Sequence, residues 1–153
     1  MKAIIAINNK GFIGKNGQML WRSSEDFKHF KKMTIGEGIN ILIVGKTTFE
    51  NDLQCKELIN RTMLVVGTNY HTLPHAVRCA YSHQSLMGEC TTAHSDIWVI
   101  GGSSIYNQLL PLISEFHISH IDDDQEGDTS FELPSNFRGK VFHYNFSPNK
   151  PKE

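Results

Sequence analysis

The stretch Met19-Leu-Trp-Arg-Ser-Ser-Glu-Asp-Phe-Lys-His-Phe-Lys-Lys-Met-Thr34 decides how the rest of the chain is organised. Its adjacent serines are residues that begin helices, and two acidic residues follow in the first turn, so a helix is predicted from here to about Met33. At helical period the apolar stripe is Phe27, Phe30 and Met33 or Thr34, while the lysines face water. The stretch therefore predicts an amphipathic helix.

Asp26 falls on the apolar side of this helix, one turn before Phe30. One interpretation is a capping box with Ser23, which would stabilise the helix start by about 1 kcal/mol. The other is a functional acid that faces a pocket. The segment before the helix, Gly11-Phe-Ile-Gly-Lys-Asn-Gly-Gln-Met-Leu-Trp21, favours the second, because its glycines indicate a mobile flap beside Asp26.

The spacing of these residues resembles the substrate-site signature of the dihydrofolate reductase family. The matching elements, in order, are Ile13-Gly14, Met19-Leu20-Trp21, Asp26, Phe30 and Thr34, with Leu20 where the family usually has proline. The resemblance continues to about Phe146, through Gly45, Arg61, Gly101-Gly102 and Gly127-Asp128-Thr129.

Composition sets the class of protein. The chain has 153 residues, 39% of them hydrophobic, and a formal net charge of −1, so we expect one globular domain and no surface for nucleic acid or anionic membranes. The 3 cysteines are widely spaced, which favours reduced thiols and the cytoplasm, and we expect no metal site. No signal peptide is visible. We predict a monomer, a domain over residues 1–147 and a disordered tail over residues 148–153.

Short apolar runs predict buried strands of a parallel sheet. They are Ala3–Ile7, Ile39–Val44, Thr62–Val66, Ile97–Ile100 and Glu115–Ile121, with a half-exposed strand over Val141–Phe146. Shorter elements are predicted between them: a helix after Gly45 to about Asn51, a strand over Val77–Ala80, a helix over Ser82–Thr92 and a helix over Ile105–Leu110 capped by the preceding serines.

The resemblance implies a single-domain α/β fold like that of dihydrofolate reductase, with a central, mostly parallel β-sheet and about four flanking helices. The family's last antiparallel strand has no counterpart in this chain. Its absence leaves Val141–Phe146 as an unprotected edge or changes how this strand pairs.

Two strand–glycine–helix junctions are candidate phosphate sites, at Gly45 and at Gly101-Gly102, because free amides at a helix start attract anions. Ordinary capped turns would have the same sequence. The resemblance implies NADPH as cofactor, held by Ala6, Ile13, Gly14, Gly45, Lys46, Thr47, Thr48, Val66, Thr68, Ile100, Gly101, Gly102, Ser103, Ser104, Ile105 and Tyr106.

By the same resemblance Asp26, Trp21, Met19 and Ser119 are catalytic, and Asp128 holds the flap closed through backbone amides. The implied substrate contacts are Ile5, Ala6, Phe27, Phe30, Leu53, Arg61 and Ile100. Arg61 would bind the glutamate tail, although a lone arginine at a strand entrance is also typical of solvated surface.

The function that follows is NADPH-dependent reduction of 7,8-dihydrofolate, with antifolates such as methotrexate or trimethoprim as inhibitors. A pyrimidine reductase of riboflavin synthesis is an alternative of the same chemical class. A reductase-like binding or structural subunit without turnover is the third, supported by Leu20, Ser104 and the missing strand.

Overall fold

The computed structural model describes residues 1–150 of the chain. Its elements in order are β1 (Lys2–Asn8), β2 (Phe12–Gly14), α1 (Ser24–Ile35), β3 (Asn40–Gly45), the short helix η1 (Thr48–Asp52), β4 (Arg61–Val66), α2 (Leu73–Cys90), β5 (Ile97–Val99), α3 (Ser103–Leu109), the short helix η2 (Leu110–Leu112), β6 (Glu115–Ile121), β7 (Thr129–Ser130) and β8 (Lys140–Phe146). No helix in this part of the chain is long and apolar enough to cross a membrane.

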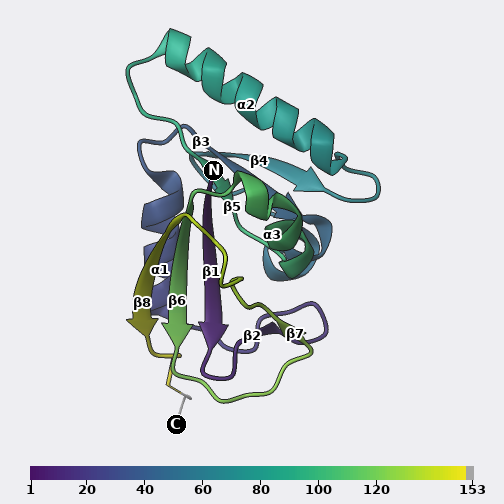
Figure 1. The fold of residues 1–153 in the computed structure, drawn as a ribbon, viewed down its shortest axis with the longest axis vertical. Coiled ribbons are helices and arrows are strands. Elements are labelled where there is room, and N and C mark those ends of the chain that lie inside the picture. Colours follow the sequence, from purple (N-terminus) through teal and green to yellow (C-terminus); the bar gives the residue numbers. More distant parts are fainter. Residues whose placement is uncertain (151–153) are drawn as a thin grey trace.

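A six-stranded sheet forms the centre of the molecule, in the order β4-β3-β5-β1-β6-β8 (Figure 1). All of its paired strands are parallel, which confirms the predicted parallel sheet. β3 is buried along its whole length, as expected for an apolar run with helices on both faces. β2 and β7 form a separate antiparallel pair beside the sheet.

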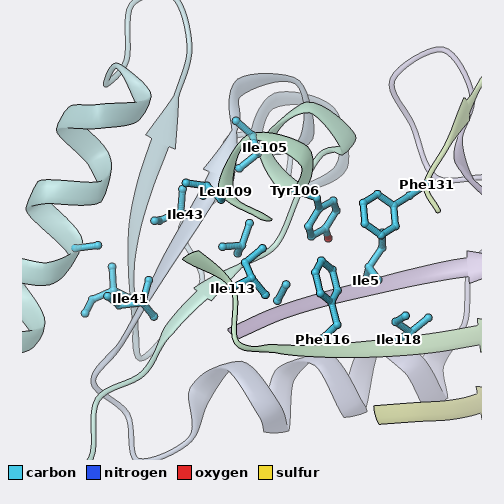
Figure 2. Close-up of a cluster of buried hydrophobic side chains, with 14 residues drawn as sticks. Ile5, Ile41, Ile43, Ile105, Tyr106, Leu109, Ile113, Phe116, Ile118 and Phe131 are labelled. Carbon is cyan, nitrogen blue, oxygen red and sulfur yellow. The ribbon is translucent and has the colours of Figure 1, made fainter. Parts of the chain in front are cut away.

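Two hydrophobic cores lie on opposite faces of this sheet. One fills the space between the sheet and helices α2 and α3, where Tyr106 and Phe116 pack against Phe131 (Figure 2). The other lies under α1 and η1 and includes Trp98 and Phe49. Both faces of the sheet are therefore covered by packed side chains.

Helix α1 begins where the serine pair predicts, since the Ser23 hydroxyl accepts a hydrogen bond from the Asp26 N–H at 3.2 Å. Thr34, near the other end of α1, is fully buried, whereas the lysines of this helix are exposed. Phe27 differs from the prediction because its side chain is 58% exposed. It lies at the border between the apolar stripe and solvent, where helical period alone places it too far inward.

The strand predicted over Val77–Ala80 is wrong, because these residues belong to the single helix α2. The helix starts earlier than expected: the Thr72 hydroxyl accepts from the His75 N–H, and Pro74 occupies the first turn. The predicted capping of α3 by serines is also wrong, since Gly102 is the cap residue and no side chain caps this helix.

β8 pairs in parallel with β6 over its full length, from Lys140 opposite Glu115 to Phe146 opposite Ile121. Within residues 1–150 the main sheet contains no antiparallel strand. After β8 the chain turns toward α1, where Asn149 N–H donates to Arg22 C=O at 2.6 Å. The predicted tail is thus anchored at Asn149, while its residues 151–153 lie outside the described part.

Candidate functional site

A cleft opens between α1, η1, the flap and the middle of the sheet. Most of its wall is apolar, and Asp26 and Asp52 are its carboxylates. The lining residues are Ile4, Ile5, Ala6, Ile13, Met19, Asp26, Phe27, Phe30, Thr48, Asp52, Leu53, Ile100, Gly101, Gly102 and Tyr106. The cleft therefore brings together residues of the proposed signature with residues from β1, from β2 and from the end of β5.

Asp26 is held in this cleft by the first turn of α1, where its N–H bonds to Ser23 while its carboxylate points to the apolar side. Burial raises the pKa of the Asp26 carboxyl, and the nearby Ser119 hydroxyl and His29 offset this only in part. Only the Ser23 half of the predicted capping box forms, because the Asp26 N–H bonds to Ser23 Oγ while the Asp26 carboxylate faces the cleft.

Two buried polar groups accompany Asp26. Ser119 Oγ and Trp21 Nε1 have no partner within hydrogen-bonding distance among the described residues, although the Ser119 hydroxyl lies close enough to the Asp26 carboxylate to lower its pKa. Their side chains are nearly inaccessible, with residual exposures of 1% and 6%. Buried polar groups in folded proteins are almost always paired, so these two atoms indicate a place for a polar ligand or an ordered water next to the carboxylate.

The flap is fastened at two points. Asp128 Oδ2 accepts from the Asn16 N–H at 2.9 Å, and the Asp128 N–H donates to the Gly14 C=O. On the other side, Asp52 Oδ1 accepts from the Met19 N–H at 3.2 Å. These backbone contacts, as predicted for Asp128, place Met19 over the mouth of the cleft.

Arg61 lies outside the cleft lining, at the entrance of β4. Its Nε donates to the Ile59 C=O at 2.9 Å and one terminal nitrogen donates to the Thr34 hydroxyl at 3.1 Å. Thr34 in turn donates to the Phe30 C=O. The guanidinium is therefore held against the end of α1, one helical turn beyond Phe30, with donors left over for an anion.

The carboxyl ends of β3 and β5 form the other half of the cleft. Gly45 N–H donates to Gly101 C=O at 2.6 Å, so the two glycine turns touch. Gly101 has φ of +117°, a conformation that favours glycine. A Cβ on Gly102 would lie 3.2 Å from Thr48 Oγ1, so the surface here is bare backbone.

The groups around this surface are of the kinds that bind phosphate. The N–H groups in the first turns of η1 and α3 lack partners within their helices, as at every helix start. Lys46 lies beside Gly67, since a Cβ on Gly67 would come within 2.7 Å of Lys46 Cβ, and Thr68 follows directly. A cation and a hydroxyl thus flank the backbone surface, as a phosphorylated nucleotide requires.

Several predicted residues do not line the cleft. They are Trp21, Ser119, Arg61, Gly14, Gly45, Lys46, Thr47, Val66, Thr68, Ser103, Ser104 and Ile105. Two lining residues were missed, Ile4 and Asp52. Among residues 1–150 no three potential ligands are grouped to hold a metal ion, although His75 Nε2 lies 3.5 Å from Cys79 Sγ.

These features define an α/β enzyme-like protein with a ligand cleft at the carboxyl ends of parallel strands, a half-buried acid and two glycine turns in contact. The sequence model of the family described as dihydrofolate reductase matches residues 1–151. The chain belongs to the dihydrofolate reductase family.

Individual relatives agree. Dihydrofolate reductase type 1 of Escherichia coli is 32% identical over 151 residues, covering 97% of this chain and 92% of the relative. The dihydrofolate reductase of Buchnera aphidicola is 32% identical over 141 residues, covering 84% and 76%. The solved dihydrofolate reductase of Enterococcus faecalis, complexed with NADP(H) and RAB-propyl, superposes with a TM-score of 0.67 at 28% identity, covering 88% and 77%.

Proposed function

We propose that this protein reduces 7,8-dihydrofolate to 5,6,7,8-tetrahydrofolate with NADPH. The observation that carries the proposal is a half-buried acid, Asp26, in a cleft whose remaining wall is mostly apolar. Bound NADPH supplies the hydride, which adds to C6 while a proton adds to N5. The residues of the chain bind and orient the heterocycle, exclude water and favour its protonated form.

Asp26 performs the binding and protonation part of this work. As a carboxylate it accepts hydrogen bonds from the amino-pyrimidine edge of the pterin and stabilises the positive charge of the protonated ring. Trp21 Nε1 and Ser119 Oγ, the two orphaned polar atoms, complete the polar end of the site. Phe27, Phe30, Leu53 and Ile100 supply the apolar walls.

NADPH is assigned to the glycine-turn half of the cleft. Thr48, Gly101 and Gly102 would hold its diphosphate, and Lys46 and Thr68 would hold its 2′-phosphate. All residues of both halves come from one chain, so turnover needs no second copy. Methotrexate and trimethoprim compete for Asp26, because both carry the same amino-pyrimidine edge. The free cysteines support a cytoplasmic location.

Asp26→Asn tests the proposal by removing the charge at nearly constant shape. We expect dihydrofolate-dependent NADPH oxidation to fall roughly 100-fold or more at neutral pH. Asp52→Asn is the comparison variant, since it removes the second carboxylate of the cleft and weakens only a flap contact, so we expect a fall of no more than about threefold to tenfold. Equal activity of Asp26→Asn and the unaltered protein would remove Asp26 from the site.

Assays on the same purified protein distinguish this proposal from the two alternative functions. A pyrimidine reductase would oxidise NADPH with the riboflavin intermediate and not with dihydrofolate. A binding subunit would quench NADPH fluorescence on titration yet turn over neither substrate.

A further inference from the structure

β8 is the last strand of the sheet, and its outer side is open. It pairs regularly with β6 over 7 residues, without a bulge, and contains no proline. Figure 1 shows no strand of the described chain beyond it. Edge strands are commonly protected by prolines, bulges or several lysines, and β8 has only Lys140 at its start. This edge is therefore available for pairing.

The backbone groups that face outward can be identified from the hydrogen bonds at the two ends of β8. Lys140 N–H donates to Ser114 C=O at 2.9 Å, and Phe146 C=O accepts from Asp122 N–H at 3.1 Å. Alternate residues of a strand direct their backbone groups to the same side. The even-numbered residues therefore bond to β6, and the outward-facing ones are Val141, His143 and Asn145.

We propose that a second copy of this chain occupies the edge, with two β8 strands paired antiparallel about a two-fold axis at His143. In this register His143 lies opposite its own equivalent and Val141 opposite Asn145. All outward residues are then paired, with two hydrogen bonds in each pair. A shift toward the carboxyl end would need Ser147, whose N–H already bonds to Glu25 and whose C=O already bonds to Ser23.

The side chains of the edge complement one another in the same register. Phe142, which is 38% exposed and stacks on His117, comes directly opposite Tyr144 of the second copy. Lys140 comes opposite Phe146, next to which Glu25 Oε2 accepts from the Ser147 N–H at 3.4 Å. Each end of the interface thus joins an aromatic pair to a Lys140–Glu25 charge pair.

The expectation of a monomer is therefore replaced by a reversible dimer. One strand per copy buries less than the roughly 800 Å² per partner of a standard interface, so the dimer should dissociate on dilution. None of the residues that line the cleft belongs to β6 or β8, although α1 contributes Asp26, Phe27 and Phe30 to its wall. Dimerisation consequently leaves the proposed turnover unchanged, and the inference does not depend on it.

Sedimentation equilibrium between about 1 µM and about 200 µM tests the dimer, with His143→Pro as the disrupting variant. Proline removes the outward N–H and leaves every backbone bond to β6 in place, and the side-chain contact of His143 with His120 Nε2 at 2.8 Å is lost equally in the alanine variant. We expect its dissociation constant to rise at least tenfold, while His143→Ala, which keeps the backbone donor, changes it by less than about threefold. Dihydrofolate-dependent turnover of both variants reports that they are folded.

Residue-resolved amide exchange of the unaltered protein gives a second readout that needs no variant. We expect the amides of Val141, His143 and Asn145 to become protected as concentration rises, whereas those of Phe142 and Tyr144 are protected throughout. A monomer at the highest concentration overturns the proposal, whether its outward amides exchange freely or are covered by another segment. A dimer with unprotected outward amides, or growth beyond two copies, also overturns it.

Discussion

Arg61 is oriented before any substrate arrives, because Ile59 C=O and the Thr34 hydroxyl accept two of its hydrogen bonds. A lysine cannot reproduce this fixed fork and binds a carboxylate through a single point charge. We therefore expect Arg61→Lys to raise the KM for dihydrofolate roughly tenfold, because one charge-assisted hydrogen bond to the substrate is lost. The kcat should be almost unchanged. Steady-state kinetics measure both constants.

Dihydropteroate, which lacks the glutamate tail, is the control substrate for this prediction. Its KM should be the same for Arg61→Lys and the unaltered protein. An equal rise for both substrates would mean that the substitution disturbs α1 through Thr34 and that Arg61 does not bind the tail.

Single residues were predictable where their position follows from local period. Met19, Asp26 and Phe30 reach the cleft because the flap and the first turns of α1 are adjacent in sequence. Asp52 was missed because it enters the site only through the packing of η1 against the flap, for which no spacing pattern exists. Ile4 is one side chain of a uniformly apolar strand, so its contact with the cleft has no separate signal.

The flap is the element whose position depends most on a few polar contacts. Asp128→Asn weakens the acceptor for the Asn16 N–H, and we expect hydride transfer to slow roughly threefold to tenfold because the cleft closes less often. Stopped-flow NADPH oxidation measures this step. Asp124→Asn is the control from the same acidic turn, because Asp124 bonds to the Asn9 side chain and not to the flap. Equal slowing in both variants would contradict the fastening role.

Most elements were predictable from apolar runs and helix-start residues, and the exceptions have distinct causes. Helix α2 was divided because Val77–Ala80 contains a β-branched residue and a cysteine, whereas the stronger signal, Thr72 followed by Pro74, lies upstream. The parallel pairing of β8 with β6 joins residues about twenty-five apart and is set by the crossover between them, which leaves no mark in either strand.

The stability of the whole molecule should depend on histidines buried between α1 and the sheet. Burial lowers the pKa of His29 and His117, which pack against Tyr144 and lie near Asp26, Lys32, Glu115 and Lys2. Below pH 6.5 the unfolded chain binds protons that these histidines do not bind in the folded state. The free energy of unfolding should therefore decrease as the pH is lowered below 6.5. The raised pKa of Asp26 acts in the opposite direction. Urea unfolding at pH 8 and at pH 5.5 measures the difference in the free energy of unfolding.

The double variant His29→Phe, His117→Phe should lose most of this difference between the two pH values. His75→Gln, on the surface of α2, is the control and should retain the difference. If the double variant shows the same difference as the unaltered protein, the acid sensitivity belongs to other residues.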